Sequence, residues 1–266
     1  MTNGVWHMED HHIDIWPHKH NIIGVNVSAI TYDEALPVVI KAAKARKSVS
    51  VSHLAVHGLV TGSQETQFRS VLNEFDIIAP DGQPVRLALN LLYGTKLPDR
   101  CYGPEFMSRL CQRAAKERIG VYLYGSQVPV VEALRRNLIA RFPGLRIVGC
   151  EPSIFRPLTG AEDKALVQRI NDSGAGIVFL GLGCPLQEKF AHQHKGKINA
   201  VMVCVGAAFD FHSGNKRMAP EWMQRCALEW AFRLSQEPRR LWRRYLPTNT
   251  LFLSKLLLQL TGLKSF

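Results

Sequence analysis

Short apolar runs rich in β-branched residues alternate with longer amphipathic segments along most of this chain, and this alternation restricts the fold more than any other feature. Residues 22–27, 49–54, 75–79, 121–124, 146–149, 177–180 and 201–205 have the length and composition of strands. Residues 32–45, 64–73, 104–118, 128–141 and 161–171 have the pattern of helices, and Thr31 and Glu34 precede the first helix at capping-box spacing. The alternation predicts an α/β fold with a Rossmann-like, mostly parallel sheet covered by helices.

Charge divides the chain into parts. The 266 residues are 46% apolar, enough for one large core, and carry a net charge of +11. From Lys216 onward ten Lys or Arg stand against three Glu, a local net charge of +7. We therefore expect a mobile head over residues 1–20, a Rossmann-like domain over 21–215 and an arginine-rich amphipathic helical appendage over 216–266. The head holds five of the ten histidines, but their spacing matches no standard ligand pattern, so no metal site is expected.

Cysteine usage and hydropathy suggest where the protein works. The six cysteines are scattered, with no CxxC pair, and the first residues do not form an apolar signal sequence. These features predict a cytoplasmic protein with reduced thiols. No apolar run approaches the roughly 20 residues needed to span a bilayer. The nearest, at 251–260, is interrupted by Ser254, Lys255 and Gln259, so the chain is expected to lie on a membrane without crossing it.

A carboxylate follows the strand expected at 75–79. Pro80, Asp81 and Gly82 form a turn at the edge where open α/β sheets bind ligands, which makes Asp81 a candidate functional residue. A second interpretation is that Asp81 caps the helix beginning near Pro84. The local sequence supports both interpretations equally.

Glycine-rich turns follow other strands. Gly125 connects a strand to a helix N-terminus, which is either an anion-binding arrangement or an ordinary turn. Gly181 and Gly183 allow backbone amides to approach a ligand, and Pro185 stands where a helix would start.

Polar side chains accompany these turns. Gln187 can both donate and accept hydrogen bonds to a sugar or base, whereas Glu188 is equally explained as a favourable charge at a helix N-terminus. Asp210 follows the last strand and is expected at the rim of the sheet.

The C-terminal segment interleaves arginine with tryptophan and leucine. The candidates for binding a diphosphate or anionic membrane lipids are Arg233, Arg239, Arg240, Arg243 and Arg244. Pro238 is expected to break the helix between Arg233 and the others. The mixture is typical of an interfacial helix, and the alternative is a solvated basic face.

Taken together, the motifs resemble the WecG/TagA/CpsF glycosyltransferases, glycosyltransferase family 26. The matching elements are Ala79-Pro80-Asp81-Gly82, Arg100-Cys101-Tyr102-Gly103-Pro104, Gly181 through Glu188, Val205 through Asp210, and Leu228-Glu229-Trp230 through Arg244-Tyr245. The resemblance implies an inverting enzyme without metal or cofactor, which moves a sugar from a UDP-sugar to a sugar carried on a polyprenyl diphosphate. The implied location is the cytoplasmic face of the bacterial inner membrane, where the enzyme is peripheral. Asp81 matches the family's proposed base, which takes the proton of the acceptor hydroxyl. Arg100, Gln187 and Asp210 match other positions of the family's pocket.

One departure from the family concerns the donor. Where the family has a Thr-x-Asn pattern, this chain has His53-Leu54-Ala55. The donor is therefore open between N-acetylmannosamine, used by better-known members, and glucose, used by a resembling branch in xanthan- or acetan-type exopolysaccharide synthesis. His57 is a candidate to replace the missing amide, although a helix-start histidine without a catalytic role is the more common case.

Two other classes of protein are compatible with the basic C-terminal segment. One is a nucleic-acid-binding module, but the chain holds no recognised RNA or DNA motif, so nucleic acid is not expected as a partner. The other is a membrane scaffold that recruits exopolysaccharide enzymes. The expected partners are a UDP-sugar, a lipid-linked sugar acceptor and an anionic membrane surface, and a homo-oligomer is compatible with this interpretation.

Overall fold

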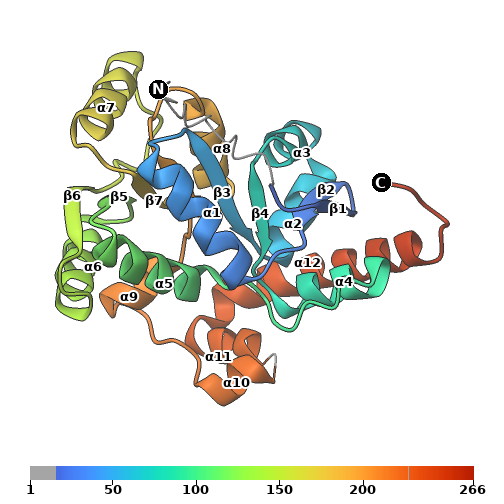
Figure 1. The fold of residues 1–266 in the computed structure, drawn as a ribbon. Helices are drawn as coiled ribbons and strands as arrows, with labels where there is room; N and C mark the ends of the chain where they lie inside the picture. Colours follow the sequence, from blue (N-terminus) through green and yellow to red (C-terminus); the bar gives the residue numbers. More distant parts are fainter. Residues whose placement is uncertain (1–15, 227) are drawn as a thin grey trace, which may run out of the picture.

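A six-stranded parallel sheet lies at the centre of the computed structural model, which describes residues 16–226 and 228–266 apart from the side chains of Arg225, Arg240 and Arg244. The strand order is β4-β3-β8-β7-β5-β6 (Figure 1). The strands are β3 (Val49–Leu54), β4 (Ile77–Pro80), β5 (Gly120–Gly125), β6 (Arg146–Glu151), β7 (Ile177–Gly181) and β8 (Val201–Cys204). Every neighbouring pair is parallel, which confirms the predicted α/β class.

Helices cover both faces of the sheet. One face carries α1 (Tyr32–Lys44), α5 (Gly103–Lys116), α6 (Val128–Arg141) and α9 (Ala208–Ser213). The other carries α2 (Val56–Gln64), α3 (Thr66–Asn73), α4 (Gln83–Tyr93), α7 (Gly160–Asp172) and α8 (Leu186–His194). Successive strand residues point to opposite faces, so Ile77 belongs to one core and Ile78 to the other. Burial on both faces explains why the strands appear as continuous apolar runs.

The N-terminal region departs from prediction. The single strand expected at 22–27 is wrong: β1 (Lys19–Ile22) and β2 (Val25–Ser28) form an antiparallel hairpin. The turn lies at Ile23 and Gly24, where φ is 46° and 98°, and the side chain of Asn21 accepts a hydrogen bond of 3.0 Å from the Gly24 amide. Of the expected head, residues 1–15 lie outside the described part of the chain, including His7, His11 and His12, while residues 19–20 belong to β1.

No helix range was predicted over α2, although His57 was interpreted as a helix-start residue, and the two glycines of this helix lower its intrinsic propensity. The structure explains them by close packing. A Cβ atom at Gly58 would lie 2.3 Å from the Leu54 side chain, and one at Gly62 would lie 2.8 Å from Leu72. These two positions therefore have no room for a larger residue, and tertiary packing outweighs the low helix propensity.

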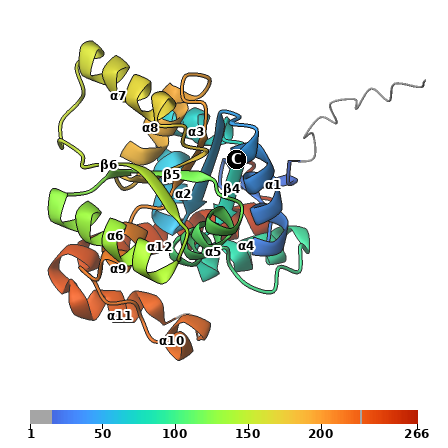
Figure 2. The same cartoon turned by 60° about the vertical axis from the view of Figure 1, so that its left-hand side comes forward.

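The C-terminal segment forms α10 (Glu221–Arg225), α11 (Glu229–Gln236) and α12 (Pro238–Leu260). The predicted helix break at Pro238 is confirmed, since this residue starts α12. Figures 1 and 2 both place α10 and α11 at the end of the molecule opposite α7. Helix α12 returns to the α/β domain and packs against α2, and its residues Phe252 and Leu256 are buried in the second core. In the described ranges, no helix has the length and apolarity required to traverse a membrane.

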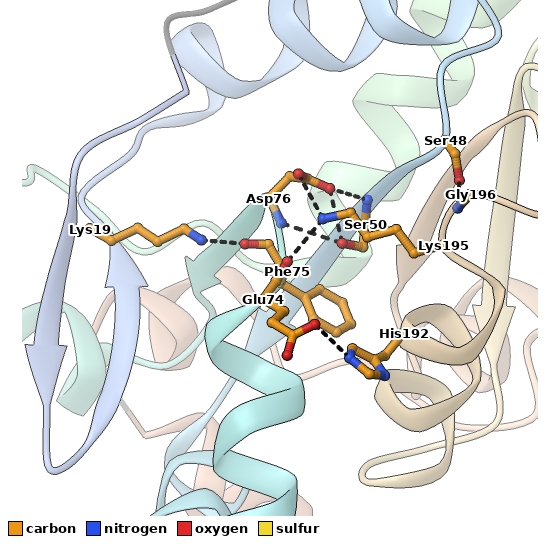
Figure 3. A network of polar contacts seen from close by, with 9 residues as sticks. All are labelled: Lys19, Ser48, Ser50, Glu74, Phe75, Asp76, His192, Lys195 and Gly196. Carbon is orange, nitrogen blue, oxygen red and sulfur yellow. Dashed lines mark hydrogen bonds and ion pairs between the residues drawn. The ribbon is translucent and has the colours of Figure 1, made fainter.

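A polar network joins the amino ends of β3 and β4 (Figure 3). The Asp76 carboxylate, just before β4, accepts hydrogen bonds of 2.8 Å from the Ser50 amide and 2.9 Å from Lys195 Nζ. The Gly196 amide donates to Ser48 Oγ over 2.8 Å. Because these contacts join β3, β4 and the end of α8, they stabilise the sheet at the end remote from Asp81.

Candidate active site

A cavity of roughly 460 Å³ lies at the carboxyl ends of β3 and β4, where α11 and α12 close over the sheet. Its lining combines polar groups from the strand ends with apolar side chains from α4 and α12. The lining residues that follow the strands or their loops include Ala55, His57, Asp81, Arg100 and Tyr102, and those from the C-terminal segment include Glu229, Trp230, Arg233, Tyr245 and Phe252. The C-terminal segment therefore forms one wall of the cavity.

Asp81 is positioned by the loop that enters α5. The Cys101 amide donates to the Pro80 carbonyl over 2.8 Å and so continues the edge of β4. Two residues later, the Gly103 amide donates to Oδ1 of Asp81 over 2.8 Å. The alternative that Asp81 caps α4 is wrong, because Gly82 is the N-cap residue of that helix. The Asp81 side chain instead accepts from the N-terminus of α5.

The environment of Asp81 favours its protonated form. Burial raises the pKa of this carboxyl group to about 6, and the negative charge of Glu229 acts in the same direction. The positive charges of Arg100 and Arg233 and the hydrogen bond from Gly103 oppose this rise. A carboxyl group with a pKa near neutrality can accept and release a proton during a reaction, which makes Asp81 a suitable general base.

Arg100 is held by a carboxylate of the C-terminal segment. Its Nη2 donates to Oε2 of Glu229 over 2.5 Å, and both side chains are only 10% exposed. The Tyr102 hydroxyl donates to Oε1 of the same Glu229 over 2.9 Å, and the Arg100 guanidinium lies 4.1 Å from the centre of the Tyr102 ring. No role was predicted from the sequence for Glu229 or Tyr102. The available signal was Glu229 itself, an acidic residue within a strongly basic segment.

The structure brings together Asp81, Arg100, His57 and Arg233 from the predicted site residues, since all four line the cavity. Ala55 stands where the family has the asparagine of its Thr-x-Asn pattern, and it also lines the cavity.

Five other predicted residues lie outside this lining, at the carboxyl ends of β5, β7 and β8: Gly125, Gly181, Gly183, Gln187 and Asp210. Gln187 is 4% exposed, and its Nε2 donates to Oε1 of Glu188 over 2.9 Å. Glu188 is fully buried and also accepts from Ser52 Oγ over 3.0 Å. Gln187 and Glu188 thus form a buried polar cluster behind the strand ends.

Close packing accounts for two of the three glycines. A Cβ atom at Gly125 would lie 2.7 Å from the backbone of Gly181, and one at Gly181 would lie 2.4 Å from the Phe209 ring. Gly183 differs, because a Cβ atom there would meet open space and only its φ of 78° favours glycine. Open space beside Gly183 is compatible with the expected approach of a ligand to the backbone.

Asp210 and the remaining arginines are near solvent. Asp210 lies in α9, where Asn215 donates to its Oδ1 over 2.7 Å and Lys216 lies 3.5 Å from Oδ2. Arg239 and Arg243 are exposed on α12. The side chains of Arg240 and Arg244 lie outside the described part of the structure.

The open parallel sheet, with its cavity at the carboxyl ends of the strands, places this chain in the class of α/β proteins that bind ligands at that edge. The family model of the glycosyl transferase WecG/TagA/CpsF family matches residues 20–265, and the chain therefore belongs to this family.

Two curated relatives carry the same name, N-acetylglucosaminyldiphosphoundecaprenol N-acetyl-beta-D-mannosaminyltransferase. The protein from Bacillus subtilis (strain 168) is 31% identical over 185 residues, which cover 69% of each chain. The protein from Bacillus spizizenii is 32% identical over 184 residues, again 69% of each chain. The family resemblance inferred from the motifs is confirmed.

Proposed function

We propose that this protein is an inverting glycosyltransferase that moves a sugar from a UDP-sugar to a sugar carried on a polyprenyl diphosphate. The observation that carries the proposal is the buried Asp81 carboxyl group, with its raised pKa, in a cavity shared with Arg100 and Arg233. Family membership supports glycosyl transfer, and the names of the relatives support a lipid diphosphate acceptor.

Asp81 acts as the base in this mechanism. The acceptor hydroxyl oxygen forms a bond to the anomeric carbon while its proton passes to Asp81. The bond from that carbon to the diphosphate oxygen breaks on the opposite side, and its electron pair leaves with UDP. Attack opposite the leaving group inverts the anomeric configuration. The transferred proton is afterwards released from Asp81 to solvent.

Arginine side chains stabilise the negative charge that develops on the leaving diphosphate in this proposal. Arg233 lines the cavity and is the first candidate, because a guanidinium group can bind two phosphate oxygens at once. The arginines of α12 follow along the same segment and would add positive charge near the cavity or at the membrane. This assignment lets the chain's own side chains supply the charge compensation.

The donor is a hexose or an N-acetylhexosamine joined to UDP. Ala55 and His57 line the cavity where the family pattern has an amide, so the contacts to a 2-acetamido group differ from those of typical members. The names of the relatives favour N-acetylmannosamine, and the altered lining favours glucose. A panel of UDP-sugars with a short-chain lipid diphosphate acceptor, followed by mass spectrometry of the product, distinguishes the two.

Association with an anionic membrane at the cytoplasmic face is part of the proposal. On α12, Trp242, Leu246, Leu253, Leu257 and Leu260 form an exposed stripe, which we call the apolar stripe. The exposed Arg239 and Arg243 lie on the same helix. Apolar side chains beside cations suit a helix lying in the headgroup region of a bilayer.

The test of the proposed function is Asp81→Asn. Transfer is expected to fall by about 10²–10⁴-fold, the usual contribution of a general base, while UDP binding measured by calorimetry is retained. Asn keeps the size of the side chain and its capacity to accept from Gly103 but cannot take a proton at neutral pH. Full transfer by this variant would contradict the role of Asp81.

A further inference from the structure

The buried Arg100–Glu229 pair joins two parts of the chain that are 129 residues apart in sequence. Arg100 belongs to the loop that positions Asp81, and Glu229 is the first residue of α11. The pair is protected from water, because both side chains are 10% exposed and the Tyr102 ring lies against the guanidinium. Ion pairs of this kind are costly to break, since one charge is then left buried without a partner.

The arrangement determines where the positive charge of Arg100 is directed. Its Nη2 donates to Glu229 over 2.5 Å and reaches Oε1 of Gln224 at 3.4 Å, so both contacts point toward the C-terminal segment. Asp81 meanwhile accepts from the Gly103 amide. Within the part of the chain that the structure describes, no ion pair of Asp81 is found. Arg100 thus lies near enough to influence the Asp81 carboxyl group while being bound to another carboxylate.

Other ionisable groups act on Asp81 or line the same cavity, from five segments, and none of them is a carboxylate that could substitute for Glu229. They are Tyr32 of α1, His57 of α2, Arg100, Cys101 and Tyr102 of the loop before α5, Arg233 of α11 and Tyr245 of α12. Two groups of the C-terminal segment act on Asp81, Glu229 and Arg233, and of these two Glu229 is the carboxylate.

We propose that Glu229 is a positioning residue for the proposed transfer reaction: by binding Arg100, it prevents that guanidinium from pairing with Asp81 and keeps the Asp81 carboxyl group available to accept a proton. The inference rests on the proposed function of Asp81 as base. A direct Arg100–Asp81 ion pair would stabilise the carboxylate and weaken it as a base. Because Glu229 lies in α11, the C-terminal segment would then determine the proton affinity of the site as well as close it.

The decisive measurement is the pKa of Asp81, determined by an NMR titration of protein labelled with ¹³C at the aspartate carboxyl groups. The Asp81 signal is assigned by its absence in Asp81→Asn. In Glu229→Gln the carboxylate charge is lost and Arg100 is released, so the pKa of Asp81 is expected to fall by about one unit, as for a carboxyl group gaining a nearby cation. This readout needs no activity, so it tests the role of Glu229 even if the proposed reaction is incorrect.

A matched control exists at the other edge of the sheet. Glu151 of β6 also binds an arginine and a tyrosine, with Arg169 Nη2 at 2.7 Å and the Tyr122 hydroxyl as its second donor. Glu151→Gln is therefore the same chemical change in a similar Arg–Glu–Tyr group that does not line the cavity. It is expected to leave the pKa of Asp81 and the transfer rate unchanged.

A double variant distinguishes the effect of the released Arg100 charge on Asp81 from a failure of the protein to fold. If Glu229→Gln fails to fold, Arg100→Gln/Glu229→Gln removes the unpaired cation, and the pKa of Asp81 is expected to equal or exceed that of the wild type. In the kinetic measurement, the acidic limb of kcat/KM in Glu229→Gln shifts to lower pH by the same amount as the NMR pKa, and Glu229→Asp restores it partly. An unchanged Asp81 pKa in Glu229→Gln, or a lowered pKa in the double variant, would overturn the proposal.

Discussion

The backbone N–H of Gly103 donates a hydrogen bond of 2.8 Å to Oδ1 of Asp81 and so fixes the carboxyl group against the N-terminus of α5. This bond does not offset burial, since the pKa of Asp81 is raised to about 6.

The raised pKa predicts how Asp81 affects stability. The folded protein binds the proton more tightly than the unfolded chain, whose aspartates have a pKa of about 3.9. Asp81 therefore destabilises the fold increasingly as pH rises from about 4 to about 6, and the destabilisation is at its maximum above that range. Asp81→Asn is expected to raise the free energy of unfolding by about 1–3 kcal/mol at pH 8. Urea unfolding at pH 8 and pH 4.5 should show that this gain shrinks at the lower pH, and an equal gain at both would contradict the assignment.

His53 predicts an opposite dependence on pH. It is buried at the end of β3, its ring centre lies 4.6 Å from that of Phe106, and burial lowers its pKa to about 4. The unfolded chain takes up this proton near pH 6.5, so stability is lost as pH falls from about 6.5 to about 4. Between pH 7 and pH 4, the free energy of unfolding of His53→Leu is expected to fall by about 2–3 kcal/mol less than that of the wild type. Parallel unfolding curves for the two proteins across this range would contradict a buried neutral histidine.

The glycines at the strand ends are expected to differ in how much an alanine substitution destabilises the fold. Gly125→Ala places a methyl group 2.7 Å from the Gly181 backbone at a φ of 128°. We expect it to lower the free energy of unfolding by about 3 kcal/mol or more. Gly183→Ala has open space, so only the positive φ opposes it, and the expected loss is about 1 kcal/mol. Thermal and urea unfolding of the pair measure the contrast, and similar losses would show that the close Gly125–Gly181 contact is not important.

Membrane association should depend on the apolar stripe. Leu253 and Leu257 are each 62% exposed, so serine at both positions is expected to reduce co-sedimentation with anionic liposomes at least several-fold, with little change in Tm. The matched control is Ile139→Ser on α6, an exposed residue remote from α12. Added salt should weaken wild-type binding, because Arg239 and Arg243 would contact the lipid charges. Binding that survives the Leu253/Leu257 change would place the membrane contact elsewhere.

Several features could be predicted because their causes are local. The strands of the main sheet follow from short apolar runs, α1 follows from the Thr31–Glu34 capping box, and the helix break follows from Pro238. The two errors have different causes, one local and one tertiary. Gly24 turns the chain within what appeared to be one strand, and the glycines of α2 concealed a helix that only packing against Leu54 and Leu72 explains.

The α/β class and the position of Asp81 after a buried strand could be predicted from the sequence, because they depend on periodicity and on residues close together in the chain. The family was recognised from the resemblance of motifs spread along the chain. Which residues share a cavity became known only from the folded chain. The fold placed Glu229 on Arg100, next to Asp81, and it placed Gln187 in a buried cluster outside the cavity lining. The physical reason is that an ion pair between distant residues, and the burial that raises the pKa of Asp81, exist only after strands and helices have packed. The C-terminal segment thus appears in the sequence as a basic tail and in the fold as one wall of the site.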